Sequence, residues 1–278
     1  MPPPNREMKH LPLLLVLLLC LASTCEEPLP VPTTDQLTKA RRERLGDLLL
    51  QTIQTQKVVE ILPDSGAVAR AYEYLESLYQ QVNNSIRIDL NSSMDNRWDR
   101  NRAWQFLIED NATARLVTLP GGHLIISTGL LQRLEREYEV YALFALETQL
   151  IAEQVLIDAL IAKYGTQTLL NLTDETLPAN ELTVQILAEE IVDVGFSESD
   201  LARTDPLALE QTCRSSLYDP TGLRPLVTTY PDLAYFATRP NYPGRADALL
   251  QFTPDQTTCG DLRTNGKYAS EVLAVLPQ

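Results

Sequence analysis

Apolar residues recur at helical spacing along most of the chain, and short strand-like runs interrupt them once. The pattern predicts a helix from Asp35 and a second one after the turn at residues 63–66, with Asp64 as its cap. Short strands are then expected at residues 85–90, 103–108, 112–119 and 123–128, with a polar surface loop at residues 91–101. This order of elements predicts an α+β fold with a small mixed sheet, because helices both precede and follow the strands.

The second helical part contains the most apolar segment of the expected domain. Residues 140–162 are apolar on most faces, which predicts a central buried helix. Ser197 begins a capping-box pattern for a helix that ends near Ser216. Asp219 and Pro220 supply a cap and a first-turn proline for the next helix.

The N-terminus predicts export across a membrane. Arg6 and Lys9 precede an apolar run at residues 11–21, so residues 1–24 have the pattern of a signal peptide. Cys25 stands where a bacterial lipoprotein is cleaved and acylated, although Thr24 departs from the small residue usual before that cysteine. A plain cleaved signal and an uncleaved membrane helix are the alternatives, and the run is short for the latter. Residues 25–34 form a proline-rich tether, and residues 35–278 are expected to form a single domain.

The net charge of the chain and the expected signal peptide together indicate where the protein is located and which partners it binds. The chain has 37 acidic and 23 basic residues, for a net charge of −14, which disfavours binding to nucleic acid. We expect a bacterial envelope protein on the periplasmic side, held to the membrane by a lipid anchor, or otherwise a protein secreted to the periplasm. Its expected partner is a polypeptide or another envelope protein.

The cysteines predict one disulfide. Cys20 leaves with the signal, and Cys25 is expected to carry the lipid. The remaining pair, Cys213 and Cys259, is expected to form a disulfide in an oxidising compartment, with two buried free thiols as the alternative.

Histidine is nearly absent from the expected mature chain. Of the two histidines, His10 lies in the signal, so His123 is the one imidazole after cleavage. A three-ligand zinc site and a Ser-His-Asp site would both depend on it, and no nucleophile-elbow, dinucleotide or phosphate-loop motif accompanies it. We expect His123 to be a strand residue at the sheet edge.

One stretch nevertheless resembles a family of zinc enzymes. The segment from Leu119 through Pro120, Gly121 and Gly122 to Leu131, an acidic spacer and the apolar helix that contains Glu147 resemble the BepA-like relatives of the CAAX-prenyl-protease family. The resemblance covers about residues 40–250 and implies a mostly helical metallopeptidase (gluzincin) domain. It also implies that the strand at Gly121, Gly122 and His123 lines a cleft for extended polypeptides.

The residues that should carry the chemistry of that family are replaced. Members have H-E-x-x-H, whereas this chain reads L-E-T-Q-L, with Leu146 and Leu150 at the two histidine positions. Counting back from Tyr218-Asp219-Pro220 puts Thr204 at the third zinc ligand. The resemblance thus implies that zinc is not bound and that Glu147 is a vestige of the catalytic glutamate, with a structural hydrogen-bonding role as the main alternative.

Two further positions agree with this interpretation. Pro206 stands where the family has an aspartate that hydrogen-bonds a zinc histidine, and Arg239 stands at the histidine of a T-H-P segment, upstream of Arg245. The resemblance therefore predicts a catalytically degenerate metallopeptidase, a pseudoprotease, with no metal or other cofactor. An active zinc metalloendopeptidase with a non-standard site and a purely structural subunit of an envelope assembly are the alternatives.

Overall fold

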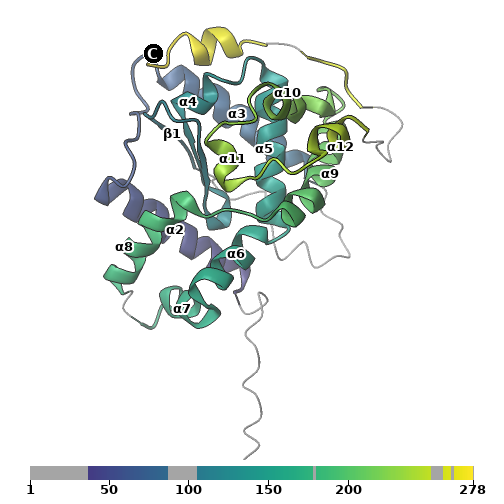
Figure 1. Ribbon diagram of the computed structural model, residues 1–278. Coiled ribbons are helices and arrows are strands. Elements are labelled where there is room, and N and C mark those ends of the chain that lie inside the picture. The colour runs from purple at the N-terminus through teal and green to yellow at the C-terminus, as the bar shows by residue number, and fades with distance from the viewer. Residues whose placement is uncertain (1–36, 87–104, 178–179, 252–258, 264–265, 278) are drawn as a thin grey trace, which may run out of the picture. The chain divides into compact units, whose positions relative to one another are not determined.

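A three-stranded sheet with helices around it gives the protein its α+β architecture (Figure 1). The computed structural model describes residues 37–86, 105–177, 180–251, 259–263 and 266–277. Cys25, the expected signal peptide and the expected tether lie outside these residues, as does the expected surface loop at residues 91–101. Contacts along the chain group Thr34–Gln278 into one unit.

The sheet is mixed, as expected from the sequence. Its strands are β1 (Phe106–Glu109), β2 (Leu116–Thr118) and β3 (Leu124–Ser127), in the order β1-β3-β2. β1 runs parallel to β3, and β2 runs antiparallel to it. All residues of β2 and β3 are buried, so both strands belong to the core.

The predicted strands are shorter in the structure, and one is misplaced. β1, β2 and β3 fall within or next to the runs at residues 103–108, 112–119 and 123–128. The strand expected at residues 85–90 is wrong at its start, because Ser85 is the last residue of a helix; residues 87–90 lie outside the described part.

The two N-terminal helices follow the predicted apolar pattern. α2 (Lys39–Gln56) begins after Thr38, whose side chain accepts a hydrogen bond from the Arg41 amide. α3 (Ala69–Ser85) begins after Val68 without a side-chain cap, so the prediction that Asp64 caps it is wrong. α2 lies very close to the turn before β3, since a Cβ added at Gly46 would stand 1.7 Å from the Pro120 carbonyl oxygen.

The single helix expected at residues 140–162 is two helices. α5 (Glu137–Ala152) ends at a break where Gln154 adopts a φ of 62°, and α6 (Val155–Tyr164) continues in a new direction. The apolar pattern could not reveal this break, because buried apolar residues continue on both sides of it. Among the described helices none alone is long and apolar enough to cross a bilayer; by length and composition only, α5 and α6 pass that test together, bent by 55°.

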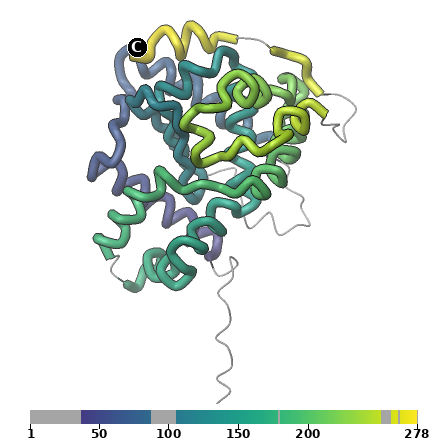
Figure 2. The backbone as a smooth tube through the Cα atoms, viewed as in Figure 1, coloured from purple at the N-terminus to yellow at the C-terminus, as the bar shows by residue number. Residues whose placement is uncertain are grey.

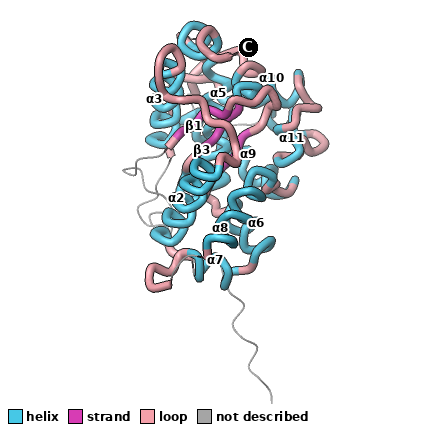
Figure 3. Tube along the Cα trace, turned by 90° about the vertical axis from the view of Figure 1, so that its left-hand side faces the viewer, coloured by secondary structure: helices cyan, strands magenta, loops and turns pink. Residues whose placement is uncertain are grey.

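The remaining helices surround the sheet and α5. They are α4 (Thr128–Leu131), α7 (Thr166–Leu172), α8 (Glu181–Glu190), α9 (Glu198–Arg214), α10 (Leu223–Thr229), α11 (Tyr235–Thr238) and α12 (Arg245–Gln251), with the 3-10 turns η3 (Pro120–Gly122), η4 (Ile191–Asp193) and η5 (Pro220–Gly222). Ser197 forms the predicted capping box of α9, and Asp219 caps the turn before α10. Figure 3 shows α7 and α8 beside α2.

The C-terminal segment is tied to the rest of the chain at several points. Cys213 and Cys259 lie at bonding distance, as the predicted disulfide requires. The π-helix η6 (Ala269–Leu273) lies against α3 (Figure 2), and the Tyr268 hydroxyl donates to the Leu131 carbonyl oxygen at 2.7 Å. The segment beyond the disulfide is therefore part of the packed structure.

Candidate functional site

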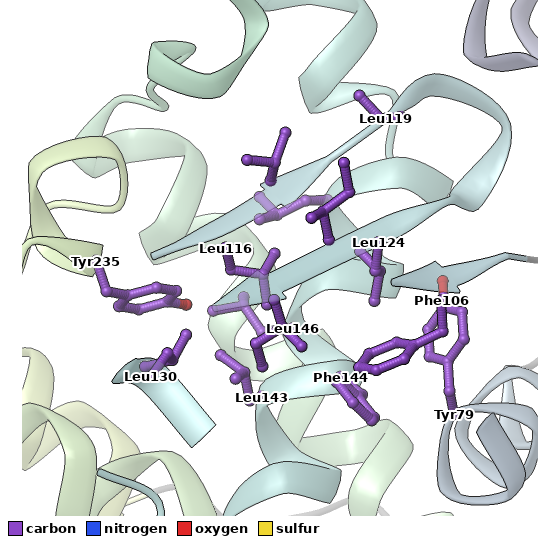
Figure 4. Packing of buried hydrophobic residues seen from close by; sticks show 14 of the residues in the cluster. Tyr79, Phe106, Leu116, Leu119, Leu124, Leu130, Leu143, Phe144, Leu146 and Tyr235 are labelled. Atoms are coloured by element: carbon purple, nitrogen blue, oxygen red, sulfur yellow. The ribbon is translucent and has the colours of Figure 1, made fainter. Parts of the chain in front are cut away.

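Glu147 lies in the middle of α5 with 0 % of its surface exposed. Leu146 and Leu150, on either side of it, are also fully buried. Figure 4 shows Leu143 and Leu146 next to Leu116 and Leu124 of the sheet. The two positions that the family resemblance assigns to zinc ligands thus belong to the apolar core, and a leucine side chain has no lone pair for a metal.

The Glu147 carboxylate forms a forked ion pair with Arg239. Arg239 Nε donates to Oε1 at 2.6 Å, and Nη2 donates to Oε2 at 2.7 Å. The Thr118 hydroxyl of β2 donates to Oε2 at 2.5 Å, and the Tyr235 hydroxyl donates to Oε1 at 3.3 Å. Each carboxylate oxygen therefore accepts two hydrogen bonds, which offset the loss of water around a buried charge.

Arg239 is satisfied equally well. Besides the carboxylate, its Nη1 donates to the Leu116 carbonyl oxygen at 3.1 Å and to the Thr238 hydroxyl at 2.8 Å, and its Nη2 donates to the Thr118 hydroxyl at 3.0 Å. These contacts use the five N–H donors of the guanidinium. Its guanidinium carbon lies 5.2 Å from the ring centres of both Phe196 and Tyr235, so two aromatic rings contact the cation.

The charges in this cluster shift the pKa of their neighbours. Burial alone would lower the pKa of Arg239, but the Glu147 carboxylate more than compensates and raises that pKa above its usual value. Burial, followed by the negative charge of Glu147, raises the pKa of Tyr235. Arg239 therefore stays charged and Tyr235 stays protonated near neutral pH, which is the state that the hydrogen bonds require.

A second buried ion pair, Asp205 with Arg245, also acts electrostatically on Tyr235. Arg245, at the start of α12, donates from Nε and Nη2 to the two oxygens of Asp205 at 2.8 and 2.9 Å. The Tyr242 hydroxyl donates to Asp205 at 3.1 Å. Burial and then the Asp205 carboxylate raise the pKa of Tyr242 to about 12. One short segment, Tyr235 to Arg245, thus carries two arginines that pair with two different helices.

Sequence reasoning missed the role of Asp205. In the comparison with the zinc family it stands one residue away from the ligand position, whereas Thr204 holds that position. In the structure the Thr204 hydroxyl donates to the Asp200 carbonyl oxygen of its own helix at 2.9 Å. Pro206 lies inside α9 and brings no hydrogen-bond donor. The signal that could have identified Asp205 is the downstream arginine pair, Arg239 and Arg245, which needs two buried carboxylates.

The predicted cleft strand is also buried. His123 lies in the turn directly before β3, the central strand of the sheet, so the expectation of a strand residue at the sheet edge is wrong. The Gln105 amide donates to His123 Nδ1 at 3.1 Å, and Nε2 lies 2.9 Å from Asp47 of α2. Gly122 is buried and its carbonyl oxygen accepts from the Tyr79 hydroxyl, while Gly121 adopts a φ of 78° in the turn.

The donors around Glu147 do not fit zinc. A zinc site needs three or four nitrogen, sulfur or oxygen ligands with free lone pairs. Here the flanking residues are leucines, the nearest cation is a guanidinium, and both carboxylate oxygens already accept hydrogen bonds. In the part of the chain that the structure describes, no group of three His, Cys, Asp or Glu residues could hold a metal ion.

The arrangement therefore works as a structural crosslink. The Glu147–Arg239 pair joins α5 to the segment after α11, and Arg239 and Thr118 extend the connection to β2. On the same helix, Thr148 and Gln149 bond to Gln211 of α9 at 3.2 and 2.7 Å. Comparison of the chain with protein-family models and with curated proteins found no match, so its function is inferred from its own residues and geometry.

Proposed function

We propose that this protein is a non-catalytic, metallopeptidase-like protein of the bacterial cell envelope that acts by binding a polypeptide or an envelope partner. One observation carries the proposal: Glu147, the residue at the catalytic position of the resembling family, is fully buried with both oxygens in an ion pair. A glutamate acting as a base in a zinc peptidase needs a metal-bound water within reach. Here the Arg239 guanidinium contacts both carboxylate oxygens and supplies the positive charge next to them, where a metal and its water would have to lie.

The finer identity, a gluzincin-type domain, is part of the same proposal. Its support is the buried α5 helix with the L-E-T-Q-L sequence, next to a mixed sheet and in contact with α9. Some of the positions taken from the resemblance also lie close together. Glu147 pairs with Arg239, Asp205 pairs with Arg245, and both pairs act electrostatically on Tyr235.

The burial of β2 and β3 argues against binding in the expected cleft. Leu116 of β2 already gives its carbonyl oxygen to Arg239, and all residues of both strands are buried. Strand addition by a polypeptide needs an open edge with free backbone groups. We therefore place partner binding on another surface. A purely structural subunit, one alternative, would also contact its partner through another surface. An active peptidase, the other alternative, would need the Glu147–Arg239 ion pair to open.

Metal content and proteolysis of the purified protein test the proposal. After incubation with zinc and gel filtration, we expect the protein to retain well below one equivalent of zinc per chain. We also expect no chelator-sensitive cleavage of casein. The matched control is Glu147→Gln, which should behave as the unmodified protein in both assays. One tightly held zinc per chain, together with cleavage that is lost in Glu147→Gln, would instead establish the active peptidase.

Membrane attachment is tested separately. If Cys25 carries a lipid, the protein expressed in a bacterium should enter the membrane fraction, and Cys25→Ala should release it as a soluble periplasmic protein. Membrane association that survives Cys25→Ala would contradict the lipid anchor without affecting the proposal for Glu147.

A further inference from the structure

Helix α8 exposes apolar side chains on the face that points away from the core. Leu182 is 66 % exposed and Ile186 is 44 % exposed, and Leu177 in the loop before the helix is 47 % exposed. Residues four apart lie on one face of a helix, so Leu182 and Ile186 form a continuous strip. The opposite face is buried through Val184 and Leu187. Apolar side chains that are exposed together on one helix face point to an interaction surface.

A groove runs beside this strip. It lies between α8 and the second half of α2 and has a volume of about 620 Å³. Its apolar lining comes from Leu48, Leu182 and Val184, and its polar lining is provided by glutamine and threonine side chains such as Gln51 and Thr55. We call this surface, with Ile186 and Leu177, the α2–α8 groove. Figures 1 and 3 both show the two helices side by side. A groove between two helices with both apolar and polar lining suits a third, amphipathic helix.

The charges around the groove select the partner. From Asp174 to Asp193 the sequence has six carboxylates and no lysine or arginine. Glu175 and Glu190 pair with Arg44 and Lys163 of other elements, whereas Glu181 is exposed and lines the groove itself. The stretch of α2 that lines the groove, from residue 48 to residue 56, has no charged residue. The surface therefore joins exposed apolar side chains and an uncharged α2 side to a carboxylate on its α8 side.

This charge pattern disfavours two other occupants. An anionic lipid surface would be repelled by the carboxylates of α8. A second copy of the same face would bring like charges together, which costs binding energy and slows association. A partner with basic residues beside its apolar residues would have complementary charge.

We propose that the α2–α8 groove binds an amphipathic helical segment of a partner protein, with apolar residues at three- and four-residue spacing and lysine or arginine beside them. The inference rests on the proposed function as a binding protein. It is independent of the zinc and casein assays, because the groove shares no residue with the Glu147 cluster. The groove proposal can therefore fail while the proposal for Glu147 stands, and the reverse is also true.

The test uses three synthetic peptides with the purified protein. The first is a helical peptide with leucines on one face and lysines on the others; the second replaces its lysines with glutamates; the third has the same composition as the first in an order without an apolar face. Fluorescence anisotropy measures each Kd. We expect the first peptide to bind at least about tenfold more tightly than the other two, because it alone matches both the apolar strip and the charge.

Variants locate the binding surface. The double substitution Leu182→Ser and Ile186→Ser should weaken binding of the first peptide at least about tenfold, since exposed anchors dominate such contacts. The matched control is Leu250→Ser on α12, which is 53 % exposed and lies outside the groove; it should leave the Kd unchanged. Thermal unfolding should be the same for all three proteins.

Several outcomes would overturn the proposal. Equal binding of all three peptides, equal loss in Leu250→Ser, or no binding of the first peptide would each do so. Binding to phosphatidylcholine or phosphatidylglycerol vesicles that the double substitution abolishes, with no peptide preference, would assign the face to lipid. A dimer that dissociates in the double variant would assign it to a second copy of this chain.

Discussion

The Glu147 cluster and the α2–α8 groove contain similar residue types in opposite settings. In the cluster, a carboxylate next to leucines is buried, and each of its oxygens accepts two hydrogen bonds. On α8, the leucine and isoleucine side chains are exposed, and the glutamates beside them lie on the surface. A buried charge must be paired, which makes the first region rigid and costly to alter. An exposed apolar strip contributes little to folding and is available for binding. Stability and interaction are therefore expected to depend on different parts of the chain.

The largest effect is expected from breaking the buried pair. Arg239→Met leaves the Glu147 carboxylate without its cation inside the core, so the free energy of unfolding should fall by about 3 to 5 kcal/mol. Urea unfolding followed by circular dichroism measures it. The matched control is Arg203→Met, because Arg203 is exposed and lies 3.4 Å from Glu153; that change should cost less than about 1 kcal/mol. Equal losses of unfolding free energy in the two variants would mean that the buried ion pair contributes no more to stability than a surface pair.

The next effect concerns the crosslink at the end of α9. Cys213 and Cys259 are 46 residues apart in sequence, and a bridge of this size restricts the unfolded chain. Replacing both cysteines with alanine should lower the free energy of unfolding by about 2 to 4 kcal/mol. Treatment of the unmodified protein with a reductant should reproduce the loss. A double variant as stable as the unmodified protein would show that the bridge contributes nothing to the fold.

Alkaline pH should lower the free energy of unfolding through the tyrosines beside the buried ion pairs, and not through the α8 face. The pKa of Tyr242 is raised from 10.0 to about 12, and that of Tyr235 is also raised. A raised pKa in the folded state means that the contribution to stability is complete below pH 10 and is lost as the pH rises from there through about 12. Urea unfolding across this range should show a falling free energy, and Tyr242→Phe should reduce the slope. A flat profile would contradict the burial of Tyr235 and the contact of the partly buried Tyr242 with Asp205.

The smallest effect on stability is expected from the groove. Leu182→Ser should change the free energy of unfolding by no more than about 0.5 kcal/mol, because the side chain is mostly in water already. Its neighbour Leu187 on the buried face is the matched contrast, and Leu187→Ser should be far more destabilising. A large loss in Leu182→Ser would show that α8 packs against the rest of the chain on both faces.

Local pattern predicted the elements better than it predicted their ends. The periodicity of α2, α3 and α9 and the cap at Ser197 were visible because each helix has one polar face or a capping box. The break at Gln154 was not visible, since the residues on both sides are apolar and buried. The central place of β3 was not visible either, because strand order depends on long-range pairing.

At the candidate site, too, the sequence could not predict contacts that depend on long-range packing. The sequence places Leu146, Leu150 and Arg239 at positions of interest through a family resemblance, but it does not show which charge pairs with which. Glu147 and Arg239 are 92 residues apart, and Asp205 and Arg245 are 40 apart. Only packing brings them together. A buried arginine implies a carboxylate partner, yet burial itself is set by the whole fold.

A double-mutant cycle on Glu147 and Arg239 tests the central claim most directly. Unfolding free energies of Glu147→Gln, Arg239→Met and the double variant give the coupling between the two side chains. A structural ion pair predicts a coupling of about 2 to 3 kcal/mol. The double variant should then lose less unfolding free energy than the sum of the losses in the two single variants. A coupling below about 0.5 kcal/mol would mean that the two groups act independently, and it would contradict the account of Glu147 as a residue of the core.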